Sequence, residues 1–171
     1  MKFNLNRCRL LSVSMIIVSM LSLSACSSAT VKAPVSIPED ALGVVFIDSP
    51  TVGSLLYLRG IAGKGEFIRK ESHDLCYRSA LRIAAGDFNG EGISIKDANT
   101  IVLAVYDPKA IKRLKEGDEI VSEDYDISVS GEPHGDIEII SGLSLSQGFV
   151  LNPGEWSLSF LFGINEERIS C

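Results

Sequence analysis

The sequence predicts an all-β domain, either a β-sandwich or an open barrel, of about eight to ten short strands with one short helix near residues 108–116. From Leu42 onward, apolar residues recur with a period near two, and each apolar run is short and ends at Gly, Pro, Asn or Asp. Alternation of this kind indicates half-buried strands. Short strands joined by short turns are typical of sandwiches and barrels.

The first strands are expected before residue 84. Residues 42–48 and 53–60 are predicted to form a pair, and residues 63–70 a shorter third strand. Residues 75–83 alternate between apolar and polar side chains as a strand does, although a short helix fits them nearly as well. The beginning of the domain is therefore predicted to be a run of neighbouring strands.

The middle of the domain contains two further strands and the helix. Residues 92–97 and 100–107 are the strands, and the second is continuously apolar, which predicts a central strand buried on both faces. The helix follows at once. Asp107 is its expected N-cap, Pro108 its first residue and Gly117 its stop.

Four more strands are expected after the helix. The sequence Asn-Pro-Gly at residues 152–154 stands between two apolar runs and predicts a tight turn. The predicted strands cover residues 125–130, 136–140, 147–151 and 155–162.

The first 25 residues have the layout of an export signal. Lys2, Arg7 and Arg9 precede an apolar segment, residues 10–23, which small residues follow. This segment is shorter than the roughly 20 apolar residues that a membrane-spanning helix needs, and four serines interrupt it. Residues 1–25 are therefore predicted to be a cleaved signal peptide.

The end of this segment resembles the lipobox of bacterial lipoproteins. Its residues are Leu23-Ser24-Ala25-Cys26. The resemblance implies that the Cys26 thiol carries a diacylglyceryl group, that the chain is cut before Cys26, and that acyl chains anchor the protein to a membrane. Ser27 stands where many Gram-negative lipoproteins of the inner membrane have aspartate, so the resemblance favours the outer membrane with the domain facing the periplasm. The alternative is an ordinary thiol after an ordinary signal.

Removal of the signal would leave 146 residues, enough for one domain with its own core. Residues 26–40 contain two prolines and no apolar period, so they are predicted to be a flexible tether, and residues 41–171 a single β-rich domain. The mature chain would carry 13 basic and 22 acidic residues, a net charge of −9. Such a surface repels phosphate backbones, so nucleic-acid binding is not expected.

Two cysteines remain for a disulfide, Cys76 and Cys171, because Cys8 leaves with the signal and Cys26 would carry the lipid. The compartments outside the inner membrane permit disulfides. The sequence therefore predicts a Cys76–Cys171 bridge, the alternative being two free thiols.

One stretch resembles an EF-hand or dockerin calcium loop. Asp87, Asn89 and Glu91 are oxygen-bearing residues at alternate positions, and Gly92 stands where the sharp turn belongs. These residues are the candidate ligands of a calcium ion.

The same stretch departs from the calcium pattern. Ala98 stands where the bidentate carboxylate belongs, and Ser94 where an apolar residue belongs, and the flanks are predicted strands rather than helices. The alternative is a β-hairpin turn in which Asn89 and Gly90 adopt positive φ angles.

Other candidate residues carry weaker signals. Glu132, His134 and Asp136 have side chains that could hold a metal, with a solvated loop as the alternative. Trp156 begins an aromatic stripe on one face of the last long strand, which either lines a ligand or partner surface or packs in the core. No G-x-S-x-G or H-E-x-x-H motif is present.

The expected function is that of a non-enzymatic, lipid-anchored module that binds another envelope protein through an edge strand or an exposed loop. The expected contacts are the membrane, through the lipid, and this protein partner. No cofactor is required by this function. The alternatives are an envelope hydrolase that uses carboxylates or calcium, and a binder of small ligands or glycans.

Overall fold

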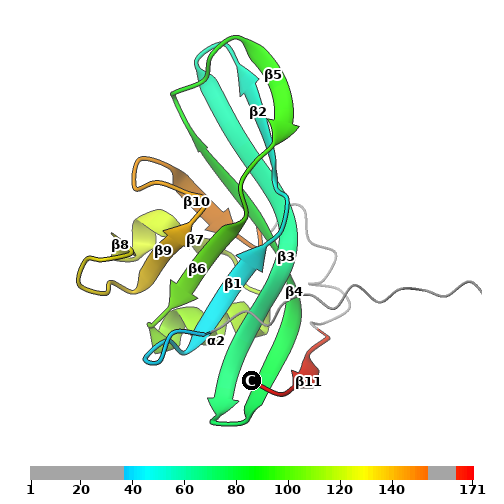
Figure 1. Cartoon of the computed structure of the whole chain (residues 1–171), viewed down its shortest axis with the longest axis vertical. Coiled ribbons are helices and arrows are strands. Elements are labelled where there is room, and N and C mark those ends of the chain that lie inside the picture. Colours follow the sequence, from blue (N-terminus) through cyan, green and yellow to red (C-terminus); the bar gives the residue numbers. More distant parts are fainter. Residues whose placement is uncertain (1–36, 154–164) are drawn as a thin grey trace, which may run out of the picture. The chain divides into compact units, whose positions relative to one another are not determined.

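The computed structural model describes residues 37–153 and 165–171, and this part of the chain is one strongly curled, open sheet with a short helix (Figure 1). The predicted all-β class with one helix is confirmed. The elements are β1 (Gly43–Ile47), β2 (Thr51–Leu55), β3 (Leu58–Ser72), β4 (Leu75–Asp87), β5 (Ile93–Asp97), β6 (Ile101–Val105), α2 (Pro108–Glu116), β7 (Ile120–Val121), a 3-10 turn (Ser122–Asp124), β8 (Ile127–Val129), β9 (Ile137–Ser141), β10 (Gly148–Leu151) and β11 (Glu167–Ile169).

The sheet has a body and an arm that share two long strands. Along the body the strand order is β7-β10-β4-β3-β1-β6-β9-β8, and β11 pairs with β4. The arm is made of β5, β2, the beginning of β3 and the end of β4, which we define as residues 51–62 and 84–97 (upper part of Figure 1). All neighbouring strands are antiparallel except β8 and β9.

β3 changes its partner strand at the junction of arm and body. It pairs with β2 up to Ala62 and with β1 from Glu66 onward. The two glycines in between are needed for a close approach, because a Cβ on Gly63 would overlap the Ile47 side chain and a Cβ on Gly65 would overlap the Phe46 carbonyl oxygen. A sequence with larger residues here could not carry one strand through both parts.

The core lies on the inner face of the body. Val45, Leu103 and Phe67 are fully buried there, and α2 covers them with Ala110 and Leu114. β6 lies between β1 and β9, and four of its five residues are buried, which confirms the predicted central strand.

The helix ends are also as predicted. The Asp107 carboxylate accepts a hydrogen bond of 3.0 Å from the Ala110 N–H, Pro108 begins the helix, and Gly117 ends it in the left-handed region with a φ of 80°. The Asp107 carboxylate and the Gly117 N–H satisfy backbone groups that the helix ends leave without internal partners, and Pro108 has no N–H that needs one.

Three local predictions were wrong. Residues 53–60 are not one strand, because the chain reverses at Leu56 and Tyr57. β1 and β2 do not pair with each other, because both pair with β3, which is far longer than the predicted strand of residues 63–70. Asn89 and Gly90 do not form a hairpin turn, because β5 pairs with β2 rather than with β4, and the left-handed residue in this loop is Gly92.

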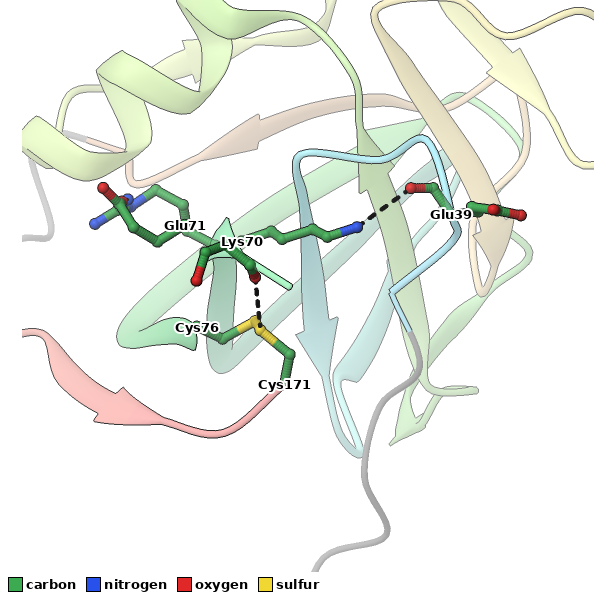
Figure 2. The surroundings of a disulfide bond; sticks show 7 residues. Glu39, Lys70, Glu71, Cys76 and Cys171 are labelled. Carbon is green, nitrogen blue, oxygen red and sulfur yellow. Dashed lines mark hydrogen bonds and ion pairs between the residues drawn. A yellow bond between two sulfur atoms is a disulfide. The ribbon is translucent and has the colours of Figure 1, made fainter. Parts of the chain in front are cut away.

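A disulfide joins β4 to the chain after β11 (Figure 2). The Cα atoms of Cys76 and Cys171 are 5.2 Å apart, and the bridge spans 95 residues of sequence, as the cysteine count predicts. The bridge therefore holds β11 at the outer edge of β4. Next to it, Lys70 of β3 donates a hydrogen bond of 3.3 Å to the main-chain carbonyl oxygen of Glu39 (Figure 2).

Candidate binding surface

One face of the arm exposes large apolar side chains. Phe88, Ile93 and Ile95 are each at least 80% exposed, and Leu55 and Leu58 are more than half exposed. We call these five residues the apolar face. Large side chains of this kind are usually buried, and a group of them in contact with solvent marks a site of interaction.

The strand register places these side chains on the same side of the sheet. Leu55 is opposite Leu58 on β3 and opposite Ile93 on β5. Ile95 is two residues beyond Ile93 and therefore points the same way. Gly60 is two residues beyond Leu58 on β3, and Gly86 on β4 is opposite Gly60, so both lie on this side of the sheet. Phe88 is two residues beyond Gly86 and therefore points the same way.

The turn at the end of the arm adds two more apolar side chains. Leu56 and Tyr57 form the two-residue turn between β2 and β3, and both are exposed. Leu56 has a φ of 55°, in the left-handed region where hairpin turns usually carry glycine. A leucine in this region costs about 1 kcal/mol relative to glycine. Backbone conformation therefore does not explain a leucine at this position.

The opposite face of the arm is polar toward its end, whereas Val52 and Ile61, nearer the body, are buried there. An open groove of about 770 Å³ lies there, lined among others by Ser54, Arg59, Ser94, Lys96 and Gln147. The two faces of one small sheet thus differ sharply in chemistry.

An ion pair crosses this polar face. Arg59 and Asp87 are directly opposite on β3 and β4, and the guanidinium donates to the carboxylate. The Asp87 carboxylate also accepts a hydrogen bond of 2.9 Å from the Asn89 N–H. Burial raises the pKa of Asp87, but the hydrogen bonds from Arg59 and Asn89 and the charge of Arg59 outweigh burial and hold the pKa below its usual range.

The three candidate calcium ligands lie in different surroundings. Asn89 and Glu91 are exposed, whereas Asp87 is engaged by Arg59. Within residues 37–153 and 165–171, no group of three or more His, Cys, Asp or Glu side chains is placed to hold a metal ion. Calcium binding stays a prediction, and a melting temperature that rises in millimolar calcium and no longer does so in Asp87→Ala would establish it.

His134 has different partners from those expected. Its Nδ1 is 3.2 Å from Glu138 Oε2, and the same oxygen accepts a hydrogen bond of 2.7 Å from the Tyr106 hydroxyl. The rings of Tyr106 and His134 stack with their centroids 4.5 Å apart. The Asp136 carboxylate instead accepts a hydrogen bond from the Asp126 N–H, so Glu132, His134 and Asp136 do not form a cluster.

Glu138 is the residue that contacts both Tyr106 and His134. It is buried on β9, and the stacked rings of Tyr106 and His134 stand beside it. Burial, followed by the hydrogen bond to Glu138, raises the pKa of Tyr106 to about 12. The arrangement fixes the loop before β9 against β6.

Two of the candidate residues lie outside the part of the chain that the structure describes. These are Cys26, the predicted lipid attachment site, and Trp156. In the described part, no helix has the length and the apolar character needed to cross a membrane.

Comparison with known proteins finds no matching family model, no matching curated protein and no matching solved structure.

The apolar face was not predicted from the sequence. Leu55 to Leu58 form an uninterrupted apolar run that reads as part of a strand, yet its middle is a turn. No sequence signal marked this turn, because the run contains none of the residues that usually form turns, Gly, Pro, Asn or Asp. Connecting segments run over the protein surface, and Leu56 and Tyr57 in this turn are exposed.

Proposed function

We propose that this chain is a lipid-anchored lipoprotein of the outer membrane, attached through Cys26, and that its domain is a non-enzymatic module that binds another envelope protein. The observation that carries the binding role is the apolar face of the arm. The resemblance of residues 23–26 to a lipobox supports the anchor, and Ser27 in place of an aspartate supports the outer membrane. The mature net charge of −9 disfavours anionic partners.

The chemistry of the apolar face fits a protein partner. Its side chains are aliphatic and aromatic and none is charged, as in the central part of protein interfaces. The surface is also held in place, because β3 and β4 pair in continuous register from Arg59 and Asp87 down to Lys70 and Cys76. A surface that is ordered before binding loses little conformational entropy on binding.

Site-specific photo-crosslinking in the native host tests this proposal. A photoreactive amino acid replaces Phe88 in the full chain, and in a matched control it replaces Lys112, an exposed residue of α2 in the body. We expect one envelope protein to be crosslinked from position 88 and not from position 112. A second chain with Cys26→Ala should lose the anchor and most of this product.

Two results would contradict the proposal. Crosslinking that is equal from both positions, or absent from both, would show that the apolar face has no specific protein partner. The alternatives, an envelope hydrolase and a glycan binder, would then be tested. A hydrolase would be sought with peptidoglycan and ester substrates, and a glycan binder by a change in Trp156 fluorescence on addition of cell-wall oligosaccharides.

A further inference from the structure

We propose that β5 pairs with β5 of a second copy of this chain, which joins two arms into one continuous sheet. This inference rests on the proposed function only in taking the arm to be a binding surface. β5 is an edge strand: it pairs with β2 on one side and with no other strand among the described residues. All five of its residues are exposed.

The ladder between β2 and β5 shows which backbone groups face outward. The Leu56 N–H donates to the Gly92 carbonyl oxygen, and the Ala98 N–H donates to the Pro50 carbonyl oxygen, both at 2.7 Å. Hydrogen-bonded pairs alternate along an antiparallel ladder, so the residues of β5 that bond to β2 are Ser94 and Lys96. Ile93, Ile95 and Asp97 therefore present their N–H and C=O groups to the open edge.

This outward edge is complementary to itself. In an antiparallel pair centred on Ile95, this residue is opposite Ile95 of the second copy, and Ile93 is opposite Asp97. All outward N–H and C=O groups of Ile93, Ile95 and Asp97 then form hydrogen bonds across the two-fold axis. Lys96 is opposite Ser94, so no like charges face each other.

Neighbouring registers are less favourable. A shift that centres the pair on Lys96 places two ammonium groups opposite each other. A shift that centres it on Ser94 leaves the outward groups of Asp97 without partners. The register centred on Ile95 is the one that satisfies the edge completely, and in it the apolar faces of both copies lie on the same side of the joined sheet.

A bilayer is a poorer occupant of this edge than a protein strand. Insertion of Ile93 and Ile95 into hydrocarbon would carry the outward N–H and C=O groups of β5 with them, and each unsatisfied group costs several kcal/mol there. A second strand buries the same side chains in part and also satisfies these groups.

Disulfide trapping tests the register. The full chain carries Cys8→Ser and Cys26→Ser, in a non-ionic detergent, and receives either Ile95→Cys or Ser94→Cys. Opposite residues in a hydrogen-bonded pair have Cα atoms about 5.5 Å apart, within disulfide range, whereas the two Ser94 positions are out of register and beyond about 7 Å. Both side chains are exposed, so accessibility is matched. We expect about tenfold more covalent dimer from Ile95→Cys after mild oxidation.

A charge exchange at the same position gives an independent measurement. Ile95→Lys and Ile95→Asp should each be monomeric in sedimentation equilibrium, because each puts like charges opposite each other on the two-fold axis. An equimolar mixture should recover the dimer. Simple misfolding of either variant would not produce this recovery.

Three outcomes would overturn the inference. The first is a parent chain that stays monomeric at about 100 µM, a concentration at which a micromolar dimer is almost fully formed. The second is preferential crosslinking of Ser94→Cys. The third is a fluorophore at position 95 that responds to phosphatidylethanolamine and phosphatidylglycerol vesicles in the absence of a dimer. In each case, specific crosslinking from Phe88 to an envelope protein would still leave the proposed function standing.

Discussion

Asp87 is the residue through which acid should act on the arm. Its pKa is below the usual range in the folded protein and near 4 in the unfolded chain, so its ion pair stabilises the fold above about pH 4 and loses this effect as the pH falls through the folded value. We expect Asp87→Asn to lower the free energy of unfolding by about 1 kcal/mol at pH 6. The difference from the parent chain should shrink toward pH 2.

Urea denaturation across this pH range measures the effect. Asp118→Asn serves as the control, because Asp118 is exposed and lies outside the arm. A deficit in Asp87→Asn that stays constant between pH 6 and pH 2 would show that the Asp87 charge does not contribute.

The buried Glu138 carboxylate depends on the Tyr106 hydroxyl. Tyr106→Phe keeps the ring stacked on His134 but removes the 2.7 Å hydrogen bond. Loss of a partner for a buried carboxylate should cost about 1–3 kcal/mol of folding free energy. Tyr57→Phe removes an exposed hydroxyl at the end of the arm and should cost nothing measurable in the same denaturation experiment. Equal stabilities of the two variants would contradict the role of this bond.

In the turn between β2 and β3, one substitution should raise the stability of the fold and weaken partner binding. Leu56→Gly relieves the left-handed leucine, so we expect the free energy of unfolding to rise by about 0.5–1 kcal/mol. The same change removes an apolar side chain from the end of the arm and should weaken crosslinking from Phe88. Tyr57→Gly, at a position without positive φ, should be destabilising instead. A less stable Leu56→Gly chain would refute the strain argument.

The elements differ in how far sequence could predict them. α2 was predictable to the residue, because its cap, its first proline and its terminal glycine are all local signals. The partner change of β3 was not, because Gly63 and Gly65 look like an ordinary flexible turn until β1 is seen to pass against them. Strand pairing joins residues distant in the chain, and period-two patterns do not say which strand lies next to which.

The same limit applies to the candidate sites. Alternate oxygen ligands at Asp87 and Asn89 gave a calcium pattern, but the pairing of β3 with β4 places Arg59 directly opposite Asp87. His134 was grouped with its sequence neighbours, whereas its partner Tyr106 comes from the end of β6, 28 residues earlier. The cysteine pair was predictable, because subtraction left two candidates.

The whole domain should depend on its disulfide. Cys76→Ala with Cys171→Ala removes a bridge that closes a loop of 95 residues, and we expect a loss of about 2–4 kcal/mol in the free energy of unfolding. Reduction of the parent chain should give the same loss, measured by urea denaturation with and without reductant. The double variant is the control and should not respond to reductant. A parent chain indifferent to reductant would contradict the bridge.

The sharing of β3 and β4 between arm and body has a mechanical consequence. β3 and β4 pair in continuous register from the arm into the body, where β3 also pairs with β1 and β4 with β10. A partner that pulls on the end of the arm therefore loads the hydrogen bonds of both of these pairings together. The arm should therefore behave as a stiff lever. If residues 26–40 form the predicted tether, this lever would transmit force and orientation from a partner directly to the core.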